Sequence, residues 1–442
     1  MITSPAFAGR HYAVLGLARS GLATVEALLA SGAKVTAWDS KPEAREKAAD
    51  AAQDLSPRLD GVELKFADPL EIDLTGYESV IVSPGVPLNK HPIVGHAAQY
   101  GVPVIGDIEL FAQARKDLPP HKVVGITGTN GKSTTTALIT HIIETAGIPA
   151  LMGGNIGLPI MGRDPLDKGG VYVLELSSYQ IDLTFSLDCD VAVLTNITPD
   201  HLDRYDGFEA YAASKMRLFQ MQSDPHAAVV NSESDWWENV RDARSGYASL
   251  IDYLNSPVGD ILSEFREWPA LQGPHNMANA EAAVVTCHQL EIDHDLIRHG
   301  LRTYPGLPHR MERVAEKGGV LYVNDSKATN ATATAPALAA YPKIHWILGG
   351  LPKTDDLDDC APFFGHVVAG YTIGQAGPMF ANILRAADKP VTESGTLDQA
   401  VRDAAAAQPG EVVMLSPACA SFDQFKDYEA RGEAFRAAVG AL

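Results

Sequence analysis

Short apolar runs rich in β-branched residues alternate with longer amphipathic or alanine-rich segments along almost the whole chain. This alternation is typical of strand–helix–strand units, in which helices cover parallel sheets. The fold class that it predicts is therefore α/β. A chain of 442 residues has room for roughly three domains of about 150 residues, each with a core of its own.

Three regions of alternation are separated by polar and proline-containing segments. Residues 1–110 predict a Rossmann-like domain, and the polar segment 113–122 predicts a linker. Residues 111–305 predict a central domain with a sheet of the P-loop ATPase type, and residues 306–442 predict a second Rossmann-like domain. The main strands that we expect are 11–17, 33–39 and 78–85 in the first domain, 122–126, 171–176 and 191–197 in the second, and 320–325, 345–350, 367–374 and 411–417 in the third.

The formal net charge of −20 disfavours nucleic acid and acidic membrane surfaces as partners, because no block of Lys or Arg offsets it. The four cysteines have no metal-ligand spacing and are interpreted as reduced thiols. We find no signal peptide and no apolar run long enough to span a membrane, so the default expectation is a cytoplasmic protein. A monomer is the default oligomeric state.

The segment GITGTNGKSTT at residues 125–135 resembles a phosphate-binding loop, but Ile126 stands where the usual G-x-x-x-x-G-K-[ST] pattern has glycine. Its glycines allow backbone N–H groups to approach phosphate oxygens, Lys132 supplies a positive charge, and Ser133 offers a hydroxyl to magnesium. The alternative is a glycine-rich turn capped by Ser and Thr. A strand before the loop and a helix after it favour the nucleotide site.

Polar residues also follow two further strands of the central domain, and ligands of open parallel sheets bind at such strand ends. Glu175 ends a strand of otherwise buried residues, where a carboxylate is costly unless it meets a cation such as Mg²⁺ or caps a helix. Asp200, His201 and Asp203 follow the next strand, and either metal binding or helix capping is compatible with them.

Lys215 lies on the apolar stripe of a predicted helix at 206–221, with the large apolar side chains and not with the polar ones. A lysine in that position usually extends its amine to water. If it is buried, desolvation lowers its pKa, and the neutral amine can react with CO₂ to form a metal-binding carbamate. Both interpretations are open on the sequence.

The first domain contains VLGLARSG, a G-x-A-x-x-G form of the dinucleotide-binding turn, and Asp39 ends the next strand. By itself this motif suggests an NAD-dependent oxidoreductase. That interpretation leaves the phosphate loop of the central domain without a role.

Several motifs together resemble the Mur ligase family of bacterial cell-wall synthesis, whose ATP loop has the form TGTNGK[ST] and so accounts for the shifted register. The motifs span nearly the whole chain. They are TGTNGKS at 127–133, GNIGLP at 154–159, ELSSYQ at 175–180, DHLDRY at 200–205, HNMAN at 275–279, GLPHR at 306–310, NDSKATN at 324–330 and SPACASFDQFKDYEARG at 416–432.

The resemblance implies an ATP-dependent amide ligase that works through an acyl phosphate and a tetrahedral intermediate in peptidoglycan synthesis. Within the family, the last motif and the first domain most resemble members that add D-glutamate to UDP-N-acetylmuramoyl-L-alanine. Other Mur ligases, adding L-alanine or a diamino acid, are the nearest alternatives. Two further alternatives are folylpolyglutamate synthase, which lacks the first domain, and a non-catalytic nucleotide switch. Such a switch would hydrolyse ATP regardless of any amino acid.

The resemblance also implies residue roles. The catalytic set is Lys132, His201, Lys215, Lys327 and Lys353. ATP would contact Gly128, Thr129, Asn130, Gly131, Lys132, Ser133, Thr134, Asn276, Asn279, Arg310 and Asp325. Two Mg²⁺ ions would be held by Ser133, Glu175, His201 and carbamylated Lys215. The nucleotide sugar would contact Arg19, Ser20, Asp39, Ser40, Lys41, Ser83, Gly85, Asn155, Ser177 and His201. D-Glutamate would contact Lys327, Thr329, Lys353, Ser421, Phe422 and Tyr428.

Overall fold

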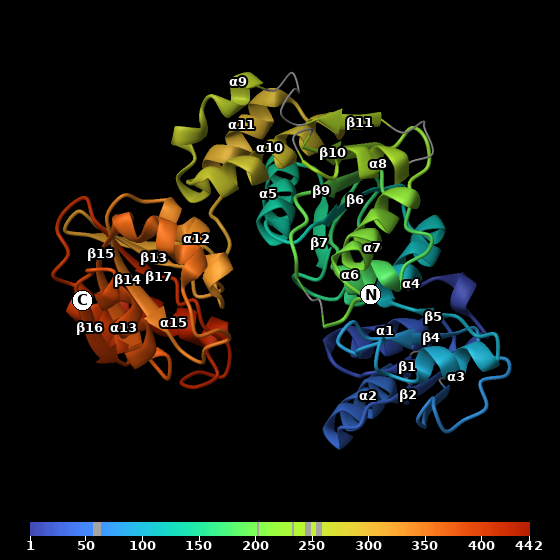
Figure 1. The fold of residues 1–442 in the computed structure, drawn as a ribbon. Helices are drawn as coiled ribbons and strands as arrows, with labels where there is room; N and C mark the ends of the chain where they lie inside the picture. The colour runs from blue at the N-terminus through green and yellow to red at the C-terminus, as the bar shows by residue number, and fades with distance from the viewer. Residues whose placement is uncertain (56–62, 201–202, 232–233, 244–248, 253–258) are drawn as a thin grey trace. The chain divides into compact units, whose positions relative to one another are not determined.

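The computed structural model describes residues 1–55, 63–200, 203–231, 234–243, 249–252 and 259–442. These residues form three separate sheets with helices packed against them, which confirms the α/β class (Figure 1). The chain divides into two compact units, Met1–Ile261 with Glu281–Gly300, and Leu262–Ala280 with Leu301–Leu442. The first unit contains two of the sheets and the second unit contains the third. The boundaries at residues 110 and 305 remain predictions.

The first sheet has five parallel strands in the order β3-β2-β1-β4-β5. Successive side chains of a strand face opposite sides, so Tyr12 and Val14 of β1 join the core that contains α1, while Ala13 and Leu15 join the core that contains α3. The elements are η1 (Pro5–Phe7), β1 (His11–Leu15), α1 (Arg19–Ala30), β2 (Lys34–Trp38), α2 (Pro42–Leu55), β3 (Glu63–Phe66), β4 (Ser79–Val82), α3 (Ile93–Gln99), β5 (Val104–Ile105), α4 (Asp107–Ala114) and η3 (Arg115–Asp117).

The predicted linker at 113–122 is wrong in its first half, because α4 and the 3-10 turn η3 extend through residue 117. Phe111 and Ala114 of α4 are fully buried in the core that both sheets of the first unit share. The Glu109 carboxylate accepts hydrogen bonds from the backbone N–H groups of Phe185 (2.7 Å) and Ser186 (2.9 Å) in the central domain. Helix α4, which ends inside the predicted linker, therefore joins the two domains by packing, which the polar composition of residues 113–122 did not indicate.

The central sheet has six parallel strands in the order β11-β10-β9-β6-β8-β7. Strands β8 and β9 are buried at every position, as expected for inner strands covered on both faces. The elements are β6 (Lys122–Thr127), α5 (Lys132–Thr145), β7 (Ala150–Gly154), η4 (Ile160–Gly162), β8 (Val171–Glu175), α6 (Ser178–Asp182), β9 (Val191–Leu194), α7 (Phe208–Gln220), β10 (Ala227–Val230), α8 (Trp237–Ala243), β11 (Ser249–Asp252), α9 (Gly259–Leu262), η5 (Phe265–Glu267), η6 (Pro269–Leu271), α10 (Pro274–Gln289) and α11 (His294–Thr303).

The third sheet has the order β12-β13-β17-β14-β15-β16, and β12 pairs antiparallel at its edge. Two cores cover its faces: Trp346 and Leu348 face one, and Ile347 and Leu415 face the other. The elements are β12 (Glu312–Lys317), β13 (Val320–Asn324), α12 (Ala331–Ala339), β14 (Ile344–Gly349), η7 (Asp358–His366), β15 (Val367–Ile373), α13 (Gly377–Ala386), β16 (Val391–Gly395), α14 (Leu397–Ala404), β17 (Val412–Leu415) and α15 (Tyr428–Gly440).

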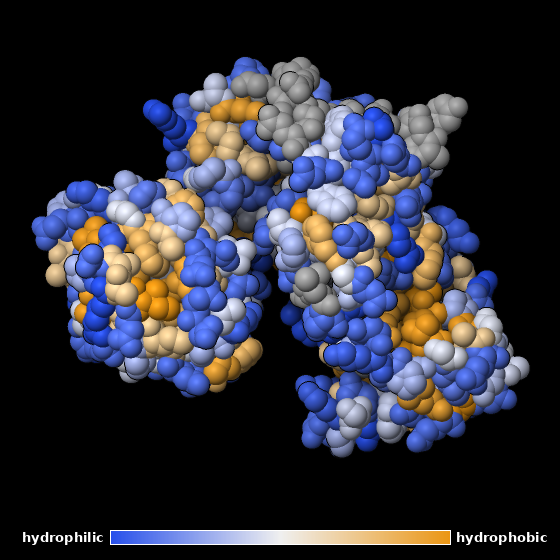
Figure 2. Space-filling view, viewed as in Figure 1, coloured by the Kyte–Doolittle hydropathy of each residue, from blue (hydrophilic) through white to orange (hydrophobic). Residues whose placement is uncertain are grey.

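The four cysteines are buried free thiols, which agrees with the reduced state expected from their spacing. None of the helices in the described ranges combines the length and the apolar character that a membrane span requires. The surface in view is mostly hydrophilic, and apolar surface gathers where the two domains of the first unit meet (Figure 2).

Candidate functional site

The loop between β6 and α5 has the geometry of a phosphate site. Gly128 and Gly131 have φ angles of +146° and +83°, which side chains with a Cβ rarely adopt. The Lys132 ammonium folds back over the loop and donates to the carbonyl oxygens of Gly128 and Thr129, at 2.8 Å each. The N-terminus of the 14-residue helix α5 adds N–H donors and a partial positive charge, so the loop suits an anion.

The end of strand β9 holds this loop in place. The Asn196 backbone carbonyl accepts from the Thr129 N–H (2.8 Å), and its side-chain oxygen accepts from the Asn130 N–H (2.9 Å). Gly128 lies so close to this strand that an added Cβ would be 2.0 Å from Thr195 Oγ1. The sequence drew attention to the loop, but it gave no sign that Asn196 fixes its shape.

Glu175 ends β8 as a buried carboxylate that is 2% exposed. Its Oε1 accepts from Asn155 Nδ2 at 2.7 Å, whereas Oε2 is buried and has no hydrogen-bond partner among the residues that the structure describes. The capping role is excluded, because helix α6 is capped by Ser177 in a capping box with Gln180. A buried carboxylate oxygen without a donor fits a cation, as a magnesium ligand would require.

Lys215 is buried, with 1% of its surface exposed, so its amine does not extend to water. Its Nζ donates to the carbonyl oxygen of Gly128 (2.8 Å) and lies 4.5 Å from the centre of the Tyr211 ring. Burial, together with the positive charge of nearby Lys132, lowers the pKa of Lys215 to about 7. The helix therefore presents to the phosphate loop an amine of which about half is neutral near pH 7.

His201 lies outside the described residues, so its predicted place in the site is untested. Its neighbours Asp200 and Asp203 do not cap the next helix, because α7 begins after Gly207 with no side-chain cap. Within the described ranges, no three His, Cys, Asp or Glu side chains gather closely enough to hold a metal. The metal ligands implied by the resemblance, Ser133, Glu175, His201 and carbamylated Lys215, therefore stay a prediction.

In the first domain, the strand ends form a compact loop site. Gly16 has a φ of +89°, and a Cβ on Gly21 would lie 1.8 Å from the Gly16 carbonyl oxygen. The Asp39 carboxylate accepts from the Leu17 N–H (2.8 Å), and the Ser83 hydroxyl donates to the Gly16 carbonyl (2.8 Å). These contacts bring together the ends of β1, β2 and β4, where four predicted nucleotide-sugar contacts remain exposed. They are Arg19, Ser40, Lys41 and Gly85.

In the third domain, predicted D-glutamate contacts follow β13, β14 and β17. Lys353 Nζ donates to Thr329 Oγ1 at 3.2 Å, and Lys327 Nζ lies 3.9 Å from the centre of the Tyr428 ring. Ser421 is buried, whereas the Phe422 side chain is 68% exposed. Four of the six residues predicted to bind D-glutamate thus contact one another in two pairs, Lys353 with Thr329 and Lys327 with Tyr428.

The remaining predicted ATP contacts belong to the second unit. Asn279 Nδ2 donates to Asn276 Oδ1 at 3.2 Å on α10. The buried Asp325 carboxylate accepts from Ser416 Oγ (2.8 Å) and from the Met311 N–H (3.2 Å). Burial raises the pKa of Asp325 to about 7.

Family models match each of the three domains. They are described as "Mur ligase MurD-like, N-terminal domain" at residues 10–106, "Mur ligase middle domain" at 126–254, and "Mur ligase, glutamate ligase domain" at 309–419. Similar proteins named UDP-N-acetylmuramoylalanine–D-glutamate ligase come from Novosphingobium aromaticivorans (63% identity, 100% of this chain and 97% of the relative), Zymomonas mobilis (58%, 100% and 100%) and Phenylobacterium zucineum (44%, 100% and 98%). This chain belongs to the Mur ligase family.

Solved Mur ligases share its fold. The UDP-N-acetylmuramate–alanine ligase from Thermotoga maritima matches 98% of this chain and 99% of its own, with a TM-score of 0.56 and 15% identity. The UDP-N-acetylmuramoylalanyl-D-glutamyl-2,6-diaminopimelate–D-alanyl-D-alanyl ligase from Acinetobacter baumannii matches 85% and 92%, with a TM-score of 0.58 and 17% identity. At these identities the likeness extends to the three-domain Mur ligase fold alone.

This Mur ligase also contains a buried arginine to which the sequence assigned no role. Arg431 on α15 is 1% exposed and has no carboxylate partner among the described residues. Its guanidinium donates to four oxygens of two loops: Ser326 Oγ (3.0 Å), Ser326 O (2.9 Å), Cys419 O (3.0 Å) and Ala420 O (3.3 Å). These loops lead directly into Lys327 and Ser421. A signal was present, because Arg431, Phe435 and Val439 lie four residues apart on one buried stripe.

Proposed function

We propose that this Mur ligase joins D-glutamate to UDP-N-acetylmuramoyl-L-alanine, with ATP converted to ADP and phosphate, in the synthesis of peptidoglycan precursors. The observation that carries the proposal is the full-length identity of 58–63% to relatives named for this reaction. The phosphate loop, the buried Glu175 and Lys215, and the lysine-rich strand ends of the third domain supply groups of the required chemistry.

Amide formation requires activation, because a carboxylate is a poor electrophile. The L-alanyl carboxylate oxygen attacks the γ-phosphorus of ATP, the bond to the β,γ-bridging oxygen breaks, and ADP leaves. The neutral amine of D-glutamate then attacks the acyl phosphate carbon, giving a tetrahedral oxyanion. Collapse of this intermediate expels phosphate and forms the amide, and the amine nitrogen loses its proton.

Negative charge accumulates at each step, so the residues around it must supply donors and cations. Lys132 and the α5 N–H groups would bind the ATP phosphates, and Lys327 and Lys353 would hold D-glutamate and the developing charge. Ser133, Glu175, His201 and carbamylated Lys215 would hold two Mg²⁺ ions, which neutralise phosphate charge when bound. Asn276, Asn279, Arg310 and Asp325 would complete ATP binding.

The nucleotide sugar would bind Arg19, Ser20, Asp39, Ser40, Lys41, Ser83, Gly85, Asn155 and Ser177. Several of these side chains already have protein partners. Arg19 donates to the Gly157 carbonyl (2.9 Å), Ser177 belongs to the α6 capping box, and Asp39, Ser83 and Asn155 make the hydrogen bonds described above. We further propose a cytoplasmic monomer, since the substrates are ATP and a soluble nucleotide sugar and one chain supplies every assigned residue.

The test is ADP release by the purified protein with ATP, Mg²⁺ and UDP-N-acetylmuramoyl-L-alanine. D-Glutamate, L-glutamate, L-alanine, L-lysine and meso-diaminopimelate are supplied in turn. We expect turnover with D-glutamate only. Turnover with another amino acid would reassign the substrate within the Mur ligases, and hydrolysis that needs no amino acid would refute ligation.

Replacing Arg431 by methionine should weaken D-glutamate use more than ATP use. The change removes the Arg431 donor from three oxygens, while the Ala420 carbonyl still accepts from the Leu351 N–H (2.9 Å). We therefore expect the free energy of unfolding to fall by about 3 kcal/mol. The KM for D-glutamate should rise roughly tenfold as the Ser326–Lys327 and Ala420–Ser421 loops lose their shared anchor. Chemical denaturation and steady-state kinetics measure these effects, with Arg431→Lys as the control that keeps the charge. Equal rises in the KM of D-glutamate and ATP would contradict a local role.

A further inference from the structure

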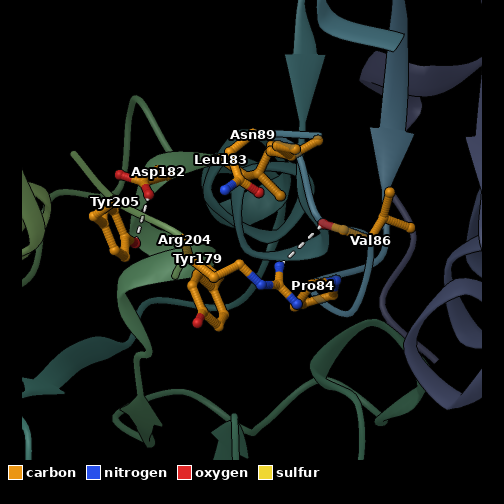
Figure 3. Close-up of a pocket in the computed structure, with 9 residues that line it drawn as sticks. Pro84, Val86, Asn89, Tyr179, Asp182, Leu183, Arg204 and Tyr205 are labelled. Carbon is orange, nitrogen blue, oxygen red and sulfur yellow. Dashed lines mark hydrogen bonds between the residues drawn. The ribbon is translucent and has the colours of Figure 1, made fainter. Parts of the chain in front are cut away.

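A cavity of about 260 Å³ lies between the two domains of the first unit (Figure 3). Pro84, Val86, Leu88 and Asn89, after β4, form one wall, and Tyr179, Asp182 and Leu183 of the α6 region form the other with residues 204–205. The volume is several times the ~30 Å³ that one water molecule occupies in the liquid. The proposed contacts of the nucleotide sugar, listed above, do not include any residue that lines this cavity.

The cavity is placed where a substrate part would be expected. Its walls follow the carboxyl ends of β4, β8 and β9, and open parallel sheets bind ligands at these ends. One wall begins at Pro84, directly after the proposed nucleotide-sugar contact Ser83. The other contains Tyr179, two residues after the proposed contact Ser177. The cavity therefore adjoins the proposed nucleotide-sugar site from both domains.

The lining combines an apolar surface with one poorly bonded donor. Pro84, Val86 and Leu183 contribute apolar side chains. The Arg204 guanidinium lies 4.5 Å from the centre of the Tyr179 ring, which holds it against the cavity wall. Its N–H groups reach the carbonyl oxygens of Val86 and Gly85 only at 3.5 Å, the outer limit of a hydrogen bond.

The other polar groups of the lining are already engaged. The Tyr205 hydroxyl donates to the Asp182 carboxylate (2.8 Å), and Asn89 Nδ2 donates to the Asp203 carbonyl (3.1 Å). Figure 3 shows Arg204 extending along Tyr179 toward Pro84 and Val86, with the Tyr205–Asp182 pair set apart from it. Arg204 is thus the donor best able to exchange its weak carbonyl contacts for a ligand oxygen.

We propose that this cavity is the subsite for the acetamido group of the muramoyl sugar. Arg204 donates to the acetamido carbonyl oxygen, and the acetyl methyl group packs against Pro84, Val86 and Leu183. The acetamido group has one acceptor oxygen and one methyl, and the lining has one weakly bonded donor and an apolar wall to match them. The inference rests on the proposed function, since it assumes that the substrate is a nucleotide-linked N-acetylated sugar.

The test compares two ligands in calorimetric binding without ATP, so that it is independent of turnover. The ligands are UDP-N-acetylmuramoyl-L-alanine and an analogue with a neutral hydroxyl group in place of the acetamido group. The wild-type protein should bind the acetamido ligand roughly fortyfold more tightly, as expected for one hydrogen bond from a charged donor plus a buried methyl. In Arg204→Met this ratio should fall to about fourfold, because only the methyl contact remains.

Val86→Trp provides a second variant that fills the cavity without removing the Arg204–Tyr179 contact. It should weaken binding of the acetamido ligand and leave the hydroxyl analogue nearly unchanged. Arg217→Met is the matched control, since Arg217 also lies over an aromatic ring, 5.0 Å from the centre of Phe185, but does not line the cavity. Its ligand ratio should equal that of the wild type.

A wild-type ratio near one, or an unchanged ratio in both Arg204→Met and Val86→Trp, would overturn the subsite. Failure of the proposed function would instead be seen as absent D-glutamate-dependent ADP release by the wild-type protein. The binding ratio therefore tests the subsite alone, and ADP release tests the proposed function alone.

Discussion

Lys215→Ala should lose most of its D-glutamate-dependent ADP release, and formate or acetate in solution should restore part of it. The structure buries the Lys215 amine against the phosphate loop and lowers its pKa to about 7, so a neutral amine is available to attack CO₂. The carbamate that forms adds a carboxylate-like anion, and the amine nitrogen loses a proton. We expect at least ~100-fold loss in kcat, because a metal ligand is removed.

Lys132→Ala is the control for this rescue. Lys132 lies in the phosphate loop that Lys215 contacts, but its positive charge would bind the proposed phosphates, so a small carboxylate should not replace it. Rescue should therefore be confined to Lys215→Ala. The wild-type protein should lose carbamate as the pH falls through about 7, since protonation removes the amine lone pair. If a folded, metal-binding Lys215→Ala shows no rescue, the carbamate is contradicted.

Local sequence patterns were sufficient for the parts of the site that one strand or one helix determines. Glu175 was predicted at the end of a buried strand, and the structure places it there with one carboxylate oxygen unpaired. The apolar stripe of α7 left both a buried and a water-exposed Lys215 amine open, and its 1% exposure decides for the buried one. In both cases the periodicity of one element determines which way the side chain faces.

Local sequence patterns did not predict contacts between residues that are far apart in the sequence. Asn196 fixes the phosphate loop from 66 residues away, and Arg431 anchors Ser326 from 105 residues away. Both depend on which strands become neighbours in a sheet, and a single strand's apolar pattern does not encode that order. The helical start of the supposed linker was missed for the same reason, since Ala114 is buried in a core that includes residues from both sheets of the first unit.

Gly128→Ala should abolish ATP binding more completely than removal of any single loop side chain. Its φ of +146° is unfavourable for alanine, and the new Cβ would meet Thr195 Oγ1 at 2.0 Å and the Asn196 carbonyl oxygen at 2.9 Å. Since Asn196 also binds Thr129 and Asn130, relief of this clash must move the anchor of the whole loop. We expect at least ~100-fold weaker ATP binding and a loss of about 3 kcal/mol in the free energy of unfolding.

Gly147→Ala separates backbone strain from the clash. Gly147 follows helix α5 with a φ of +76°, but an added Cβ there has no heavy atom within 4 Å. This variant should cost about 1 kcal/mol of stability and bind ATP as the wild type does, because the loop anchor is untouched. Calorimetric titration with ATP and urea denaturation of both variants make the comparison. Equal ATP affinities of Gly128→Ala and Gly147→Ala would show that the contact between the loop and the end of β9 does not control the nucleotide site. Lys132 and the N-terminus of α5 would then have to account for ATP binding by themselves.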